Sequence, residues 1–190
     1  PAPYWVSFPE QVLLAGGRPV ILPTREDDGF VARAAAAKRL VTKATRGIVL
    51  CSPSNPTGAI IPEEEIAAFA DLAIERDLYL IFDECYERFV YEGRSHTSPA
   101  RHWRRLRDRL VLVSTLSKTY AMTGWRIGYA VSARPIIEAI ATVQSHDATH
   151  PTACAQAAAV EALSGPQDDV DLMLAEYQVR RGGMIAGLKA

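Results

Sequence analysis

The chain of 190 residues carries 21 basic and 22 acidic residues, for a formal net charge of −1, and 48% of its residues are hydrophobic. This balance gives no overall reason to expect nucleic acid or an anionic membrane as a partner, and the length allows one good hydrophobic core. The three cysteines are far apart and odd in number, so they predict no disulfide framework and no metal-binding pair, and no apolar run approaches the roughly 20 residues of a membrane span. A reducing, cytoplasmic setting is the simplest interpretation.

The N-terminal part of the chain predicts short elements joined by loops. Residues 1–8 are rich in proline and aromatic side chains and predict a loop that enters a helix near Pro9. Gly16 and Gly17 end this helix, because glycine readily adopts the left-handed conformation of a helix C-cap. A candidate strand follows at residues 19–22 and a turn at residues 27–29. Residues 32–41 are rich in alanine and predict a helix.

The middle of the chain alternates apolar runs with helical patterns. Residues 47–51, 78–82 and 110–113 are short, continuous apolar runs, as expected for strands buried on both faces of a parallel sheet. Pro62 stands where a helix tolerates proline, at its first turn, and three glutamates follow it at the positive end of the helix dipole. The remaining predicted elements are a fourth strand at residues 127–131 and three helices, at residues 135–145, at residues 152–163 and from Asp168 to the end.

This alternation predicts an α/β fold with a mainly parallel sheet. In such sheets, ligands bind at the carboxyl ends of the strands. Asn55, Asp83 and Lys118 each follow one of the three apolar runs. The polar residues therefore gather where a ligand site is expected.

Residues 111–131 (VLVSTLSKTYAMTGWRIGYAV) carry the most informative pattern. The apolar run leads to hydroxyls at Thr115 and Ser117, Lys118 follows at once, and Arg126 comes eight residues later among glycines. Hydroxyls and a guanidinium suit a phosphate, and an amine attacks a carbonyl, so the pattern predicts a site for a phosphorylated carbonyl cofactor. The alternative is a strand, a polar turn and a second strand, with Lys118 and Arg126 on the surface.

A pyridoxal phosphate enzyme needs several groups together. An amine joins the cofactor's aldehyde, and a carboxylate keeps the pyridine nitrogen protonated, so that the ring draws electrons from the substrate. Hydrogen-bond donors hold the ring oxygen, a cup of polar groups holds the phosphate, and an aromatic side chain stacks on the ring. The sequence contains a candidate for each of these roles.

The chain resembles the middle of a class I/II aminotransferase of the aspartate aminotransferase family, among the fold-type I pyridoxal phosphate enzymes. Three motifs carry the resemblance in the family's order and spacing, at residues 55–58 (NPTG), 83–86 (DECY) and 117–128 (SKTYAMTGWRIG). Residues 3–5 (PYW) and the closing helix also fit. The implied fold is a three-layer α-β-α sandwich, present here incompletely.

The resemblance implies a role for each candidate residue. Lys118 would form the Schiff base with pyridoxal 5′-phosphate and carry a proton during catalysis, and Asp83 would pair with the pyridinium nitrogen. Asn55 and Tyr86 would hold the ring oxygen, and Trp5 would stack on the ring face. Thr115, Ser117 and Arg126 would bind the phosphate. Each has a structural alternative, as a helix cap, a turn former or a packing residue.

The chain begins without methionine and stops within a helical pattern, so we expect a piece of a longer protein. The resemblance implies the same, since the family's N-terminal phosphate turn and its C-terminal small domain are missing. Residues 1–165 would form most of a large cofactor-binding domain, incomplete at its N-terminal side, and residues 166–190 the start of a long helix leading to a small domain. We expect a homodimer that moves an amino group from an amino acid, with aspartate or glutamate as the expected donor, to a 2-oxo acid.

Two other functions remain open. One is a pyridoxal phosphate-dependent lyase or decarboxylase, because the cofactor cradle is shared and substrate orientation chooses the bond that breaks. The other is the aminotransferase-like, ligand-sensing domain of a transcription regulator. Five arginines within residues 101–109 predict a solvated connection rather than a nucleic-acid site. Cys85 is interpreted as a packing residue, and His146 and His150 as surface or interface residues.

Overall fold

The computed structural model describes residues 1–189, and Ala190, the end of the helix predicted from Asp168, lies outside the described residues. Strands β1 to β4 span Gly47–Cys51, Tyr79–Asp83, Leu110–Thr115 and Gly128–Val131. Helices α1 to α8 span Ser7–Leu14, Ala34–Lys38, Glu63–Glu75, Trp103–Leu106, Leu116–Thr119, Arg134–Asp147, Ala153–Ser164 and Asp168–Lys189. The short 3₁₀ helices η1 to η3 span Glu26–Asp28, Pro99–His102 and Thr123–Trp125.

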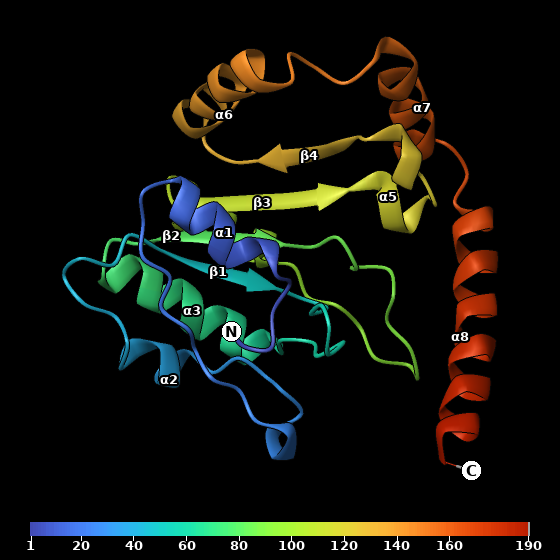
Figure 1. Cartoon of the computed structure of the whole chain (residues 1–190), viewed down its shortest axis with the longest axis horizontal. Helices are drawn as coiled ribbons and strands as arrows, with labels where there is room; N and C mark the ends of the chain where they lie inside the picture. The colour runs from blue at the N-terminus through green and yellow to red at the C-terminus, as the bar shows by residue number, and fades with distance from the viewer. Residues whose placement is uncertain (190) are drawn as a thin grey trace.

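The four strands form one sheet in the order β1-β2-β3-β4, in which the first three are parallel and β4 runs antiparallel to β3. The prediction of an α/β fold with a mainly parallel sheet is therefore confirmed. In Figure 1 the strands lie between α6 and α7 on one side and α2 and α3 on the other, which gives three layers. Helix α8 stands beyond the carboxyl ends of the parallel strands.

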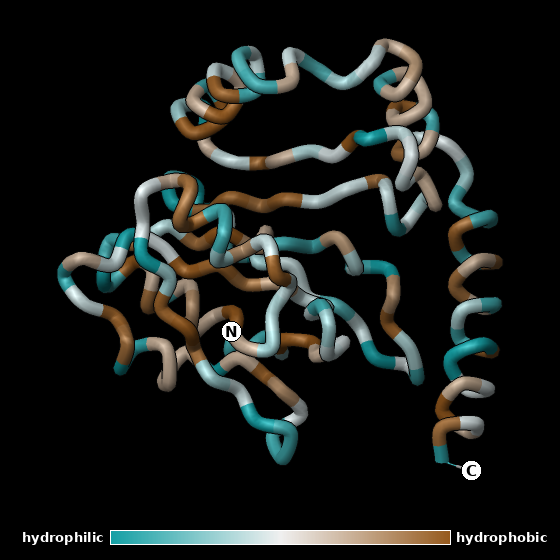
Figure 2. The backbone as a smooth tube through the Cα atoms, viewed as in Figure 1, coloured by the Kyte–Doolittle hydropathy of each residue, from teal (hydrophilic) through white to brown (hydrophobic). Residues whose placement is uncertain are grey.

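The main core lies between α3 and the sheet. Ile66 and Phe69 of α3 are fully buried, and their spacing of three residues places them on one face of the helix. Leu80 and Phe82 of β2 are also fully buried, and their spacing of two places them on one face of the strand. Figure 2 shows this apolar interior along the strands, with more polar chain in the loops that follow them.

A second, smaller core holds α7 against the connection between β3 and β4. Leu116, Met122 and Ile127 of that connection pack with Ala155 and Ala159 of α7, and all five side chains are buried. The two alanines are four residues apart and so present one small-sided stripe of the helix. This packing fixes the connection that carries Lys118.

One predicted strand is wrong. Residues 19–22 form no strand, and near them the chain makes only an isolated bridge between Ala2 and Pro23. The two bonds of this bridge run from Ala2 N to Leu22 O and from Thr24 N to Ala2 O, at 2.8 and 3.1 Å. Without a neighbouring strand of the main sheet, the local β-propensity of these residues produces no longer pairing.

Two other predictions differ in extent. The helix expected over residues 32–41 is the five-residue α2, and the looser stretch before β3 contains η2 and α4. The predicted fourth strand, the helices at residues 135–145 and 152–163 and the long closing helix are all present, with ends shifted by one or two residues where described. Pro62 precedes α3 as its N-cap residue, so proline does stand at the start of that helix.

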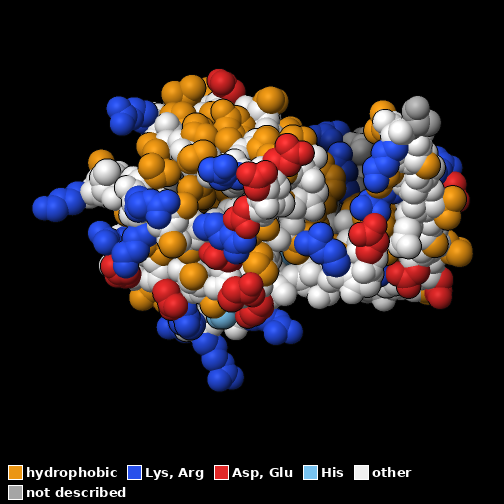
Figure 3. Space-filling view, turned by 90° about the horizontal axis from the view of Figure 1, so that it is seen from below, with side chains coloured by type: hydrophobic (Ala, Val, Ile, Leu, Met, Phe, Trp, Pro, Cys, Tyr) orange, Lys and Arg blue, Asp and Glu red, His pale blue; other side chains and the backbone are white. Residues whose placement is uncertain are grey.

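Charged side chains of both signs are interspersed with apolar ones on the face in Figure 3. Within the arginine-rich stretch, Arg105 pairs with Asp71 and Arg109 with Asp77. The basic side chains there are therefore partly neutralised by acidic partners on neighbouring elements. No helix within residues 1–189 combines the length and the hydropathy that crossing a membrane requires.

Candidate functional site

The carboxyl edge of the parallel strands brings predicted residues from three loops together. Asp83 is the last residue of β2 and lies in register with Cys51, which ends β1, and with Val113 of β3. Asn55 follows β1 by four residues, and Lys118 lies in α5, directly after β3. The parallel register thus delivers an amide, a carboxylate and an amine to one end of the sheet, as the sequence predicts.

Tyr86 connects two of these groups. The amide nitrogen Nδ2 of Asn55 lies 3.4 Å from the Oη atom of Tyr86, and Nζ of Lys118 lies 5.8 Å from the centroid of the Tyr86 ring. The second distance is within the range of a cation–π attraction. Burial raises the pKa of the Tyr86 phenol above its ordinary value, and the hydrogen bond with Asn55 only partly opposes this shift. Phenol, amide and amine therefore share one small region.

Asp83 is buried and is held in place by the chain that follows it. Its Oδ1 atom accepts a hydrogen bond of 2.9 Å from the backbone N–H of Cys85. Burial, with the Asp83 carboxylate as a further cause, raises the pKa of Cys51 to about 12 and also raises the pKa of Cys85. Both thiols are therefore protonated at neutral pH and are poor nucleophiles, in agreement with the interpretation of Cys85 as a packing residue.

The turn after β3 is built by a hydroxyl cap. Thr115 is the N-cap residue of α5, and its Oγ1 accepts a hydrogen bond of 3.1 Å from the backbone N–H of Ser117. The acceptors near its own proton are Ser117 Oγ at 2.9 Å and the carbonyl oxygen of Ile127 at 3.0 Å. The capping alternative is thus observed for Thr115, and binding of a phosphate by Thr115 and Ser117 stays a prediction.

Arg126 sits at the return of the chain into β4. Its backbone is left-handed, with φ of 54°, and its guanidinium Nη1 donates to the carbonyl oxygen of Thr123 at 3.0 Å. Gly128 then pairs with Thr115, and a Cβ atom there would lie 2.6 Å from the carbonyl oxygen of Ser114. Glycine at this position is what lets β4 approach β3 so closely. The Arg126 side chain remains exposed.

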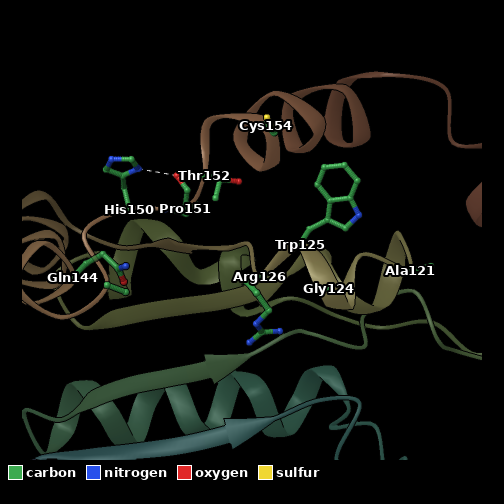
Figure 4. Close-up of a pocket in the computed structure, with 10 residues that line it drawn as sticks. Ala121, Gly124, Trp125, Arg126, Gln144, His150, Pro151, Thr152 and Cys154 are labelled. Atoms are coloured by element: carbon green, nitrogen blue, oxygen red, sulfur yellow. Dashed lines mark hydrogen bonds between the residues drawn. The ribbon is translucent and has the colours of Figure 1, made fainter.

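A hollow of about 570 Å³ lies beside Arg126, between η3, the end of α6 and the start of α7. Figure 4 shows that Trp125 points toward α7, whereas Arg126 points the opposite way, toward the sheet. Of the eight predicted site residues, all of which the structure describes, only Arg126 lines this hollow. His150, which also lines it, is exposed, as the sequence predicts.

Trp5 has an aromatic contact within the N-terminal segment. Its ring packs edge-on against Phe8, with the ring centroids 5.5 Å apart, and 42% of the residue is exposed. This contact is local to the N-terminal segment. Stacking of Trp5 on a ligand therefore stays a prediction.

The sequence did not reveal two arrangements around the site. The first is a buried pair between Glu84 and His96, with 2.7 Å between Oε1 and Nε2. Glu84 adjoins Asp83, and the alternation of side chains along β2 predicts that the two point to opposite faces, but nothing in the sequence indicates that His96 is the partner of Glu84.

The second arrangement ties α8 to the segment that follows Tyr86. Two ion pairs join them, Arg88 with Asp171 at 2.8 Å and Arg181 with Glu92 at 2.6 Å. Phe89 also packs edge-on against Tyr177 with ring centroids 5.4 Å apart, and the Arg181 guanidinium lies 5.5 Å from the centroid of the Tyr91 ring. Helix α8 thus approaches the site through this segment. Complementary charges on a helix and a loop more than 80 residues apart cannot be matched by reading the sequence alone.

The fold and the site define an α/β protein that gathers an amine, a carboxylate and a phenol–amide pair at the carboxyl ends of parallel strands. The family described as aminotransferase class I and II matches residues 1–190. The chain is 40% identical over 188 residues to an aspartate aminotransferase of Bacillus subtilis, covering 99% of this chain and 48% of that protein. It is 42% identical over 192 residues to an aspartate/prephenate aminotransferase of Thermus thermophilus, covering 100% of this chain and 49% of that protein.

Solved structures of aspartate aminotransferases also match the fold of this chain. An aspartate aminotransferase from Thermus thermophilus with maleate matches with a TM-score of 0.90 at 41% identity, over 99% of this chain and 49% of that one. An aspartate aminotransferase from Rhizobium meliloti matches with a TM-score of 0.94 at 37% identity, over 100% of this chain and 48% of that one. The chain belongs to the class I and II aminotransferase family. It spans about half the length of the relatives that it matches.

Proposed function

We propose that the protein containing this chain is a pyridoxal 5′-phosphate-dependent aminotransferase that moves an amino group from aspartate or glutamate to a 2-oxo acid. The observation that carries the proposal is the convergence of Lys118, Asp83, Tyr86 and Asn55 at one end of the sheet. The names of the relatives support transamination over the lyase and the regulator alternatives.

The donor set fits the cofactor. The buried carboxylate of Asp83 suits a protonated ring nitrogen, because a buried anion requires a positive or hydrogen-bonding partner. Asn55 and Tyr86 offer an N–H and an O–H, 3.4 Å apart, for a ring oxygen. Thr115, Ser117 and the exposed guanidinium of Arg126 are the groups that would bind the phosphate, and guanidinium can do so in a bidentate manner.

Pyridoxal 5′-phosphate, when bound, supplies a ring that withdraws electrons from the α-carbon of the amino acid. The chain's own residues prepare this chemistry. With the cofactor bound, Asp83 would keep a proton on the ring nitrogen, and Lys118 Nζ would carry a proton from the substrate's α-carbon to the cofactor's aldehyde carbon. The Tyr86 ring lies 5.8 Å from the Lys118 amine, within the range of a cation–π attraction.

The assembly is proposed by analogy with the family, and the setting from the three unpaired cysteines. A homodimer in the cytoplasm is our proposal, with the amino acid and the 2-oxo acid as the only partners. Sedimentation of the complete protein at micromolar concentration tests the dimer.

The activity is tested by incubating the complete protein with pyridoxal 5′-phosphate, aspartate and 2-oxoglutarate and measuring glutamate. We expect transfer that falls by at least about a hundredfold in Lys118→Ala, because general acid–base catalysis contributes about 10²–10⁴-fold. Lys43→Ala, which changes an exposed lysine, is the matched control. Transfer that survives Lys118→Ala unchanged, or release of carbon dioxide or ammonia in place of transfer, would refute the proposal.

A further inference from the structure

A buried histidine–carboxylate pair lies next to the cofactor-binding residues without belonging to them. Nε2 of His96 is 2.7 Å from Oε1 of Glu84, and the two side chains are only 8% and 9% exposed. Within the described residues, Nδ1 of His96 is buried without a hydrogen-bond partner. Among the described residues, Glu84 is therefore the one side chain that forms a hydrogen bond with the ring.

Glu84 is anchored at the end of β2. Its backbone N–H donates to the carbonyl oxygen of Val113 at 2.9 Å, which extends the ladder between β2 and β3 by one residue beyond Asp83. Because side chains alternate along a strand, Glu84 points to the same face as Phe82 and away from Asp83. The ring of His96 agrees with this, since its centroid lies 6.4 Å from that of Phe82.

The pair also closes a loop. Residues 84 and 96 are its two ends, and Tyr86 lies near the first of them. The backbone N–H of Glu87 donates to the carbonyl oxygen of Glu84 at 3.0 Å, and that of Phe89 donates to the carbonyl oxygen of Tyr86 at 2.8 Å. The chain from Asp83 to Tyr86 is thus held at Glu84 on both sides, by the sheet and by the turn.

We propose that His96 is a positioning residue, which acts through Glu84 to hold Asp83 and Tyr86 in the geometry that the cofactor requires. The inference rests on the proposed function. His96 touches neither Asp83 nor Tyr86 in the contacts described, so its effect passes through the backbone on either side of Glu84.

The surroundings explain why the histidine matters. Burial and the nearby Glu84 carboxylate raise the pKa of Glu87. Burial raises the pKa of Tyr129, a hydrogen bond with Ser114 partly opposes this shift, and the Glu87 and Glu84 carboxylates add to it. The Glu84 carboxylate therefore acts on two neighbouring acidic groups, and its position matters to both. An unpaired buried carboxylate is costly, so removal of His96 would drive Glu84 toward solvent and displace its neighbours along the chain.

The test uses the complete protein with pyridoxal 5′-phosphate as the probe and measures two properties. One is cofactor affinity, and the other is the pH midpoint of the bound cofactor's visible absorption. His96→Leu removes the hydrogen-bond partner of Glu84, whereas His96→Gln provides an N–H that can reach it. If His96→Leu does not fold, His96→Asn, which is polar but shorter, takes its place.

The chain offers a matched control in its second histidine–carboxylate pair. Nε2 of His102, in η2, lies 3.4 Å from Oε1 of Glu63, at the start of α3, and neither residue is a sequence neighbour of Asp83 or Tyr86. His102→Leu should lower stability without moving either cofactor property.

In His96→Leu we expect affinity to fall about tenfold and the midpoint to rise by about one pH unit, the size of one weakened hydrogen bond to a charged group. His96→Gln should restore most of both. Wild-type values in a folded His96→Leu or His96→Asn protein would overturn the positioning role, as would equal shifts in His102→Leu. A wild-type protein that binds no cofactor would instead overturn the proposed function.

Discussion

At the scale of single residues, Thr115 combines two candidate roles in one hydroxyl. Its Oγ1 caps α5 by accepting the backbone N–H of Ser117. Thr115→Val keeps the shape and removes the cap, so we expect a loss of about 1 kcal/mol, and no more than about 2, in the free energy of unfolding. Urea denaturation of both proteins measures this difference.

Thr115→Ser is the control for that measurement, because serine retains the capping oxygen. It should unfold within about 0.5 kcal/mol of the wild type. Equal stability of the valine variant and the wild type would contradict the cap. If the hydroxyl also binds phosphate, the valine variant alone will bind pyridoxal 5′-phosphate more weakly.

At the scale of elements, the pairing of β3 with β4 depends on one glycine. A Cβ atom at Gly128 would lie 2.6 Å from the backbone oxygen of Ser114, which is too close for any real contact. Gly128→Ala should therefore push β4 away from β3 and destabilise the fold by about 1–3 kcal/mol.

Gly124 supplies the matched control, since a Cβ atom there would meet no atom within 4 Å. Gly124→Ala should change the free energy of unfolding by less than about 0.5 kcal/mol. Both variants can be compared in one set of urea titrations. A Gly128→Ala protein as stable as Gly124→Ala would show that β4 is not constrained by this contact.

The elements differ in how far the sequence predicts them. Continuous apolar runs predict β1, β2 and β3, because strands covered on both faces leave no polar alternation. The same reasoning fails at residues 19–22, where a short apolar stretch has only Ala2 as a backbone partner. Whether such a stretch becomes a strand depends on a neighbour that is remote in sequence, and local pattern does not contain that information.

At the scale of the whole molecule, some features of the site can be predicted from the sequence and others cannot. Asn55, Asp83 and Lys118 can be placed together because the fold class alone puts strand ends at one edge. The pairing of Glu84 with His96, and of α8 with the loop after Tyr86, follows only from three-dimensional packing.

The stability of the whole chain should depend on pH through Glu87, whose pKa is raised by burial and by the Glu84 carboxylate. Below about pH 4 this carboxyl is protonated in both the folded and the unfolded chain. As the pH rises past the ordinary glutamate value of about 4.3, the unfolded chain loses the proton first, so the folded state loses stability until Glu87 has also ionised. Glu87→Gln should remove that loss.

Thermal melts at pH 4 and pH 7 test this sign. We expect Glu87→Gln to raise the melting temperature at pH 7 and to leave it nearly unchanged at pH 4, while Glu26→Gln, which changes an exposed carboxyl, has little effect at either pH. A Glu87→Gln protein that is less stable than the wild type at pH 7 would contradict the raised pKa.

The most direct test of the cofactor site is peptide mass mapping of the complete protein after addition of pyridoxal 5′-phosphate and reduction with borohydride. Reduction makes the bond between the cofactor and an amine permanent, so the modified lysine is read from the peptide masses. We predict an adduct on Lys118 and on no other lysine of residues 1–190, lost in Lys118→Ala. A complete protein with no adduct, or with an adduct on another lysine such as Lys38 or Lys43 instead, would contradict the assignment.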